Sequence, residues 1–433
     1  MRMYDIIEKK RDGKELGLSE LSFFIREYCK GSIPDYQASA LIMAIFINGM
    51  NENETGWLTE VMASSGDMID LSEIEGVKVD KHSTGGVGDK TTLIVGPVVA
   101  ACGVPVAKMS GRGLGHSGGT IDKLESIPGF ITSISKEEFI SNVKDIGLSI
   151  SGQTGNLAPA DKKIYALRDV TATVNNISLI ASSIMSKKIA CGADRIVLDV
   201  KTGSGAFMKN LEDSIKLAKL MVKIGEQVGR KTAAIITDMD MPLGYAVGNS
   251  LEVIEAIETL KGRGPEDLEE VSVELAAKML ELAGKGDIET LRRKAKSVIK
   301  DGSALDKLEK MIERQMGDPG VIYDYSRFAK ASISYEYLCP QDGFIAGIKT
   351  DMLGIASMIL GAGRETKESI IDPSAGIEFF ARKGMKLNKG DLVAVLHTNR
   401  EEKLSEALEV LKTSIVISDN MPDKRPLILE YVN

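Results

Sequence analysis

Cysteine and histidine are scarce in this sequence of 433 residues. It contains three histidines and four cysteines, and the cysteines (Cys29, Cys102, Cys191 and Cys339) are widely spaced. This spacing gives neither a metal-binding pattern nor a disulfide framework. We therefore expect the protein to reside in a reducing compartment, the cytoplasm.

The sequence also lacks a basic excess and a long apolar run. Its formal net charge is −8, whereas broad, nonspecific nucleic-acid binding needs a basic face. No window approaches an apolar membrane span, and the first ten residues lack the apolar core of a signal peptide. We expect neither nucleic acid nor a membrane as a partner. An anionic substrate would need a local positive pocket.

The sequence divides into segments with different patterns of hydrophobic residues. Hydrophobic residues make up 43% and charged residues 27% of the chain, and its length allows two or three domains. Residues 1–66 show helical periodicity, and the stretch 35–47 is apolar nearly all round, as in the middle of a bundle. Residues 160–190 are again predicted to be helical. We predict that these two stretches form one helical domain.

Short apolar strands alternate with helices through most of the remaining chain. In residues 76–155 and 194–330 this alternation predicts an α/β domain with a mostly parallel sheet. Residues 331–433 contain short strands typical of antiparallel pairing, and the turn at 384–391 resembles that of a barrel-sandwich. The predicted fold class is α/β, with a small all-helical domain, a large mixed α/β domain, and a barrel-sandwich-like α+β lobe packed on the latter.

A glycine-rich stretch at 79–92 stands out as a candidate anion site. It reads Val-Asp-Lys-His-Ser-Thr-Gly-Gly-Val-Gly-Asp-Lys-Thr-Thr and precedes an apolar run of helical length. A strand end, a glycine turn and a helix start aim backbone N–H groups and the helix dipole at one point. Lys81 adds a charge and the hydroxyls add donors. The stretch predicts a phosphate site, whereas an ordinary tight turn is the alternative.

A second glycine-rich turn, at 110–120, follows another strand-like segment. It contributes Ser110 and Thr120, and Lys108 lies in the strand before it. Because the carboxyl ends of neighbouring parallel strands lie at one edge of a sheet, both turns should meet there. The sequence therefore predicts one phosphate held by hydroxyls, backbone donors and two lysines.

These segments resemble the thymidine and pyrimidine-nucleoside phosphorylase family. The run Ser-Gly-Arg-Gly-Leu-Gly-His-Ser-Gly-Gly-Thr-Ile-Asp-Lys-Leu-Glu at 110–125 looks like the family signature, and residues 81–89 are similar to its phosphate loop. The order of domains also matches, so the resemblance covers essentially the whole chain. Lys108 stands where strict thymidine phosphorylases usually carry an apolar residue, which favours the bacterial pyrimidine-nucleoside branch.

The resemblance implies a role for each matching residue. Implied catalytic residues are His82, Lys81, Arg168 and Lys187. The implied phosphate ligands are Lys81, Ser83, Thr92, Lys108, Ser110 and Thr120, and the implied pyrimidine ligands are Arg168, Ser183 and Lys187.

Spacing supports the pyrimidine set independently. Ser183 and Lys187 lie one turn apart on one helical face, and two cations with a hydroxyl suit the polar edge of a flat ring. For Arg168 the alternative is a solvated helix end paired with Asp169. His82, near the base O2, could stabilise a departing anion as an imidazolium or as a neutral hydrogen-bond donor. Its alternative is a loop histidine that satisfies a backbone group.

The resemblance also implies a bound monovalent cation, taken to be potassium. The matching positions are Gly88, Lys90, Leu243, Ala246 and Glu255. Carbonyl oxygens with one carboxylate suit a weakly charged, hard ion. Lys90 sits where some relatives have threonine, which matters little if only its carbonyl is used. No organic cofactor is expected.

The implied reaction is reversible phosphorolysis of pyrimidine nucleosides, such as uridine, thymidine and deoxyuridine. Phosphate would attack in an interdomain cleft that closes, with inversion, to give free base and pentose 1-phosphate for nucleoside salvage. A homodimer through the apolar N-terminal helices is expected. The alternatives are a strict thymidine phosphorylase, an anthranilate-type phosphoribosyltransferase and a noncatalytic binder. Phosphoribosyltransferases of that type often grip magnesium with an Asp-Glu pair, and the sequence contains no such dipeptide.

Overall fold

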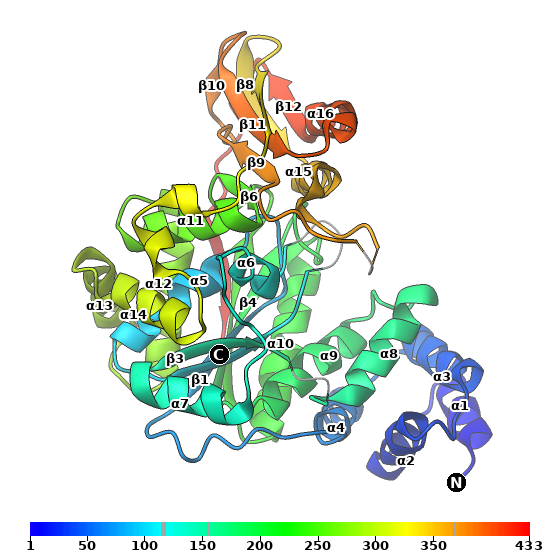
Figure 1. The fold of residues 1–433 in the computed structure, drawn as a ribbon. Coiled ribbons are helices and arrows are strands. Elements are labelled where there is room, and N and C mark those ends of the chain that lie inside the picture. Colours follow the sequence, from blue (N-terminus) through cyan, green and yellow to red (C-terminus); the bar gives the residue numbers. More distant parts are fainter. Residues whose placement is uncertain (114–117, 154–155, 367–368) are drawn as a thin grey trace.

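The computed structural model describes residues 1–113, 118–153, 156–366 and 369–433. Figure 1 shows three parts: a group of helices that includes the N-terminus, a central α/β region, and a group of short strands formed mainly by the C-terminal quarter of the chain. This arrangement confirms the predicted fold class, apart from the barrel discussed below.

The helical part is built from two separate stretches of sequence. Its apolar cluster joins Leu41 and Leu58 of the N-terminal helices to Ile164 and Leu179 of the later ones. Burial of this cluster holds the two stretches together, since short helices gain most of their stability from packing. The helices are α1 (Met3–Arg11), α2 (Leu18–Cys29), α3 (Asp35–Asn48), α4 (Glu52–Ala63), α8 (Pro159–Val170) and α9 (Ile177–Ala190).

The central sheet has four strands in the order β1-β4-β5-β13. Strands β1 (Val79–Ser83), β4 (Arg195–Thr202) and β5 (Lys231–Asp238) run parallel. The last strand of the chain, β13 (Ile428–Val432), pairs antiparallel with β5. A separate parallel pair, β2 (Val106–Ser110) and β3 (Leu148–Gly152), packs near β1. The end of the chain thus completes the central sheet.

Helices cover both faces of this sheet. Along β4, Val197 joins an apolar cluster with the helices on one face, whereas Ile196 and Leu198 join a cluster with α9 and α10 on the other. This is the period-two alternation of a strand buried on both sides. The helices of the α/β region are α5 (Thr91–Ala101), α6 (Thr120–Leu124), α7 (Lys136–Ile146), α10 (Leu211–Gln227), α11 (Asn249–Leu260), α12 (Glu266–Leu282), α13 (Ile288–Lys300) and α14 (Ser303–Arg314).

The C-terminal part contains two open antiparallel sheets. One has the order β6-β9-β11-β7 and includes β6 (Ala246–Gly248), which comes from the α/β region; the other has the order β10-β8-β12. Among the described residues neither sheet closes into a barrel, so the barrel-sandwich likeness does not extend beyond short antiparallel strands. The remaining elements are η1 (Pro319–Ile322), η2 (Tyr325–Arg327), β7 (Ile333–Leu338), β8 (Gly343–Ile348), α15 (Thr350–Ser357), η3 (Met358–Ala362), β9 (Gly376–Phe379), β10 (Lys386–Leu387), β11 (Leu392–Thr398), α16 (Glu401–Ser414) and β12 (Ile415–Ser418).

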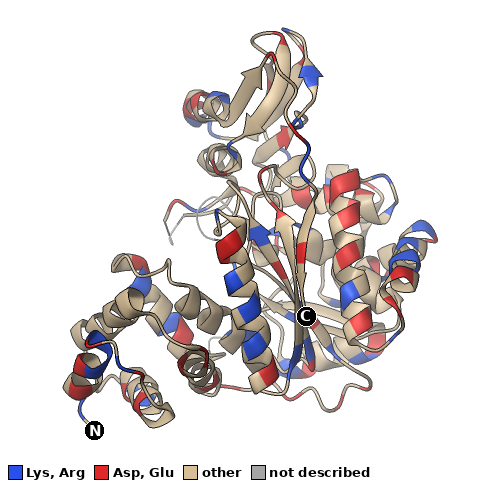
Figure 2. Cartoon of the chain, turned by 180° about the vertical axis from the view of Figure 1, so that it is seen from behind, with Lys and Arg blue, Asp and Glu red and all other residues tan. Residues whose placement is uncertain are grey.

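Charges of both signs are spread over the outer helices. Figure 2, turned by 180° from Figure 1, shows basic and acidic positions interspersed along these helices. Within the described residues, no helix combines the length and apolar character that a membrane crossing requires.

Candidate active site

A cavity of about 480 Å³ lies where the helical part meets the strand ends of the α/β region. Ser83 ends β1 and Ser110 ends β2, and both line the cavity from the carboxyl edge of their strands. Arg168 of α8 and Lys187 of α9 line it from the helical part. Its size suits a small ligand, and the position is the one expected for ligand sites in α/β folds.

Most of the predicted phosphate ligands line this cavity. They are Ser83, Thr92, Lys108, Ser110 and Thr120. Thr92 lies in the first turn of α5, at the positive end of the helix dipole. The two glycine-rich turns therefore do come together, although residues 114–117 of the second turn, including His116, lie outside the described residues.

Lys108 is a buried cation on the phosphate side. Its Nζ donates a hydrogen bond to the carbonyl oxygen of Lys81 and lies 3.4 Å from Oδ1 of Asp80. Burial, opposed by Asp80 and reinforced by the neighbouring ammonium of Lys188, lowers the pKa of Lys108 from its ordinary 10.5 to about 8. Lys108 is thus mainly charged at neutral pH but close to its titration range.

Lys81 is directed elsewhere. It is not among the residues that line the cavity; its Nζ lies 3.3 Å from Oδ2 of Asp199 and 4.0 Å from Oδ1 of Asp89, and it donates to the Thr91 hydroxyl. These contacts tie β1 to β4 and to the start of α5. In this arrangement Lys81 stabilises the glycine-rich loop.

Arg168 is buried rather than solvated. It is 1% exposed, and its guanidinium donates to the carbonyl oxygens of Thr173 (3.2 Å), Leu179 (3.1 Å) and Val174 (2.7 Å). This geometry contradicts the alternative of a solvated helix-end residue. A guanidinium carries five N–H donors, and three of them contact these carbonyl oxygens; the other two have no hydrogen-bond partner among the described residues.

Ser183 and Lys187 lie together, as their helical spacing predicts. Nζ of Lys187 donates to Oγ of Ser183 over 2.9 Å and also pairs with Asp161 of α8. Asp161 did not emerge from sequence reasoning. A carboxylate near a helix start is common, so no local signal marked it. In the structure it fixes the position of the Lys187 ammonium.

His82 lines the same cavity and is half-buried. The pKa of its imidazole is well below the ordinary 6.5, first because burial disfavours the charged form and then because four ammonium groups surround it, those of Lys188, Lys108, Lys187 and Lys81. Of the two protonation states considered above, this arrangement therefore favours the neutral imidazole at neutral pH.

Sequence reasoning missed two further charged groups at this site. The carboxylate of Asp80, in β1, is fully buried and pairs through Oδ2 with Nζ of Lys188 at 2.6 Å. Lys188 also lines the cavity and donates to the carbonyl oxygen of Met109 over 3.0 Å. No local signal marks Asp80, because β1 (Val79–Ser83) contains mainly polar residues and does not stand out as a buried strand.

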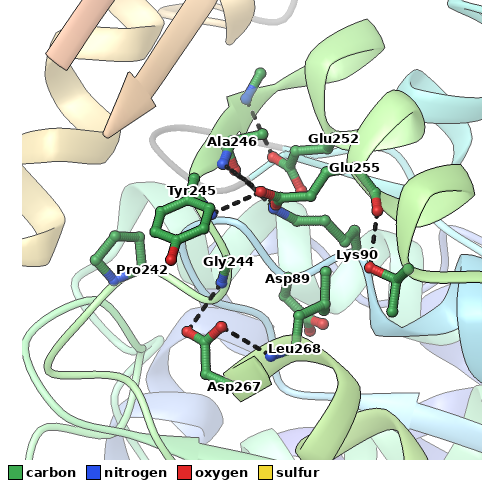
Figure 3. A network of polar contacts seen from close by, with 12 residues as sticks. Asp89, Lys90, Pro242, Gly244, Tyr245, Ala246, Glu252, Glu255, Asp267 and Leu268 are labelled. Carbon is green, nitrogen blue, oxygen red and sulfur yellow. Dashed lines mark hydrogen bonds and ion pairs between the residues drawn. The ribbon is translucent and has the colours of Figure 1, made fainter. Parts of the chain in front are cut away.

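The predicted cation ligands also converge, away from the cavity. Gly88 packs against the carbonyl oxygens of Leu243 and Ala246, and Glu255 lies beside them. Figure 3 shows the side chain of Lys90 reaching into this group. Its Nζ donates to the carbonyl oxygen of Ala246 over 2.7 Å and to Oε2 of Glu255 over 2.5 Å.

Three sequence families match successive parts of the chain. The glycosyl transferase family helical bundle domain matches residues 4–66, and the glycosyl transferase family a/b domain matches residues 75–305. The pyrimidine nucleoside phosphorylase C-terminal domain matches residues 344–418. A pyrimidine-nucleoside phosphorylase of Geobacillus stearothermophilus is 56% identical over 98% of this chain and 100% of its own length.

The chain belongs to the pyrimidine-nucleoside phosphorylase family. A second member, from Bacillus subtilis, is also 56% identical and aligns over 93% of each chain. A third, from Staphylococcus haemolyticus, is 56% identical over 95% of this chain and 96% of its own. The likeness to the family therefore extends through the helical, α/β and C-terminal parts alike.

A solved structure outside the phosphorylases has a similar fold. The anthranilate phosphoribosyltransferase of Thermus thermophilus aligns with a TM-score of 0.59 at 19% identity, covering 72% of this chain and 99% of that chain. At this identity the match concerns the fold alone.

Proposed function

We propose that the protein catalyses the reversible phosphorolysis of pyrimidine nucleosides to free base and pentose 1-phosphate. The observation that carries the proposal is that one cavity has two chemically distinct sides. Hydroxyls and Lys108 at the strand ends suit phosphate, whereas Arg168, Ser183 and Lys187 on the helices suit the base. The 56% identity to pyrimidine-nucleoside phosphorylases supports it over almost the full chain.

The phosphate side holds the nucleophile. Ser83, Thr92, Ser110 and Thr120 supply hydroxyl donors, and the Lys108 ammonium supplies charge. Lys81 contributes by holding the loop through Asp199 and Thr91, and becomes a direct ligand only if it exchanges those partners. A phosphate oxygen then attacks the anomeric carbon from the face opposite the base, so the configuration inverts.

The base side receives the leaving group. As the bond between the anomeric carbon and the pyrimidine nitrogen breaks, its electron pair stays with the base, which becomes anionic. Two N–H groups of Arg168 and one of Lys187 have no partner among the described residues, and these donate to the ring oxygens and nitrogen. His82, neutral before ligands bind, donates its ring N–H toward the base O2.

The two sides come from different parts of the fold, so we assign them to separate domains that close on each other. Residues 1–66 with 160–190 carry the base, 76–155 with 194–330 carry phosphate, and 331–433 pack beside the latter. Closure of the first body on the second would exclude water from the cavity. Small-angle scattering with and without phosphate and a nucleoside analogue tests this, and an unchanged radius of gyration with both bound contradicts it.

We also propose a cytoplasmic homodimer formed through the N-terminal helices. Helix α3 leaves Tyr36 and Ile47 exposed, at 74% and 73% of their surface. Large apolar side chains on an outer helix favour pairing with a second copy. Light scattering after gel filtration should give twice the chain mass, and the double variant Tyr36→Glu, Ile47→Glu should give the chain mass.

The proposed reaction is tested with purified protein and a panel of nucleosides. Uridine, thymidine and deoxyuridine should release base only when phosphate is present, whereas inosine should not react. Turnover should persist with a chelator of divalent cations, which separates this reaction from a magnesium-dependent phosphoribosyl transfer. Absence of phosphate-dependent base release would contradict the proposal.

A further inference from the structure

A lysine side chain ends in a small group of oxygen atoms that lies apart from the active-site cavity. Lys90 is the residue before α5, and its side chain has 0% exposure. Its Nζ contacts the carbonyl oxygen of Ala246 at 2.7 Å and Oε2 of Glu255 at 2.5 Å, as the dashed lines in Figure 3 show for this network. Such distances are those of charge-assisted hydrogen bonds.

The oxygen atoms around this ammonium are fixed by the backbone. The Glu255 carboxylate accepts N–H bonds from Tyr245 at 2.8 Å and from Ala246 at 3.2 Å. Gly88 has φ +75°, and a Cβ there would lie 2.7 Å from the carbonyl oxygen of Leu243 and 3.2 Å from that of Ala246. Only glycine allows this close approach of backbone. The group is therefore preformed and has little room to rearrange.

These are the residues at which the family resemblance implies a potassium ion, and the side chains present do not fit one. An ion bound to Ala246 and Glu255 would have to share their oxygens with an ammonium that already contacts both. It would also place two positive charges beside one buried carboxylate, which is unfavourable where water cannot screen them. The ammonium already balances the charge of Glu255.

We propose that the Lys90 ammonium takes the place of a monovalent metal ion in this protein, so that the fold requires no potassium. The tethered cation links the start of α5 to Ala246 of β6 and to Glu255 of α11. Thr92, two residues further on, lines the active-site cavity. This cation is always present because it is covalently attached to the chain.

Thermal unfolding of the wild-type protein tests the inference without any activity assay. After exhaustive dialysis into choline chloride, its melting temperature should be the same in potassium, sodium and choline chloride at equal ionic strength. A ligand that binds only the folded state at well above its dissociation constant raises the melting temperature by several degrees. A rise specific to potassium, or one equivalent of potassium retained after gel filtration in choline buffer, would overturn the proposal.

The variant Lys90→Thr tests whether a potassium ion can replace the Lys90 ammonium at the same site. It removes the ammonium and leaves the surrounding oxygens, so its melting temperature should fall in choline chloride and recover in part with potassium. Lys10→Thr is the matched control, because Lys10 is a similarly buried lysine (3% exposed) whose Nζ lies 2.7 Å from Glu54 in the helical part. It should lose stability equally in all three salts.

The variants also decide how far the inference holds. If Lys90→Thr responds to potassium no more than Lys10→Thr does, these oxygens are not a cation site and the proposal fails. If Lys90→Thr does not fold in any salt, the wild-type salt comparison still decides. Because every readout is stability or bound metal, failure here is distinguishable from failure of the proposed reaction.

Discussion

Nζ of Lys108 lies 3.4 Å from Oδ1 of Asp80, and both side chains are almost inaccessible to solvent. The other carboxylate oxygen of Asp80 is 2.6 Å from Nζ of Lys188. One buried carboxylate therefore pairs with two ammonium groups, so these three groups together carry a net positive charge. Under the proposed function, a bound phosphate would offset this charge.

The first prediction concerns the pH dependence of phosphate binding. The pKa of Lys108 is lowered by burial to about 8, so its ammonium is present below that pH and is lost as pH rises through it. KM for phosphate should therefore rise above pH 8, by up to about tenfold per pH unit. Steady-state kinetics from pH 7 to 9.5 measure it. In Lys108→Met, KM should be high at pH 7 and lack this rise; an unchanged rise would assign it to another group.

The second prediction concerns the charge of His82. Burial and four surrounding ammonium groups hold its pKa well below 6.5, so its titration midpoint should lie below that of an ordinary histidine. The chain has only three histidines, so NMR of protein labelled with ¹⁵N-histidine can resolve them. The signal lost in His82→Asn identifies the residue. A titration midpoint at or above 6.5 in the ligand-free protein would contradict the prediction.

The third prediction separates the base side from the phosphate side. Ser183→Ala removes a hydroxyl at the cavity while Arg168 keeps its three carbonyl contacts. It should lower kcat/KM for nucleoside roughly tenfold, and Arg168→Met roughly 10- to 100-fold, the range expected for lost neutral and charged hydrogen bonds. KM for phosphate should change less than about twofold in Ser183→Ala. A larger change in KM for phosphate than in kcat/KM for nucleoside would mean that Ser183 contacts phosphate and not the base, which would contradict the prediction.

The fourth prediction concerns the last strand. Val432 of β13 packs in the apolar cluster with Ile236 and Val200, whereas Glu430 is exposed. Val432→Asp buries a carboxylate without a partner and should cost about 3 kcal/mol or more, whereas Glu430→Gln should stay within about 0.5 kcal/mol. Urea unfolding measures both. Equal effects would mean that β13 contributes little to the central sheet.

Local patterns in the sequence were sufficient to predict the fold class and the meeting of the two glycine-rich turns. The two glycine-rich turns follow strands and precede helices, so the general rule for parallel sheets brings Ser83 and Ser110 to one edge. The family resemblance singled out Ser183 and Lys187, and their contact agrees with the helical spacing between them. In these cases the residues that meet are either close in sequence or lie at the carboxyl ends of neighbouring parallel strands.

Contacts between distant segments were not predictable in the same way. Lys81 pairs with Asp199 because β1 aligns with β4 in a register that brings Ser83 opposite Asp199. Nothing near Lys81 in the sequence specifies that register. Similarly, β13 joins the central sheet after crossing from the C-terminal part, and β6 joins the C-terminal sheet. Such exchanges depend on how whole layers pack.

The direction in which a side chain points could not be predicted from the local sequence either. The prediction at Lys90 used only its backbone carbonyl, whereas the structure directs its ammonium to Glu255, which is 165 residues away in sequence. Asp161 likewise gains its role only because α8 lies beside the Lys187 turn of α9. A helix start with an acidic residue is too common to indicate such a partner.

The most direct test of the proposed function follows both products of one reaction. Purified protein is mixed with uridine and inorganic phosphate, base release is followed by absorbance, and the phosphorus species are followed by ³¹P NMR. The proposal predicts that one phosphate is converted to a pentose 1-phosphate ester for each uracil released, and that adding ester and uracil regenerates uridine. Uracil release without phosphate consumption, or no release at all, would contradict it.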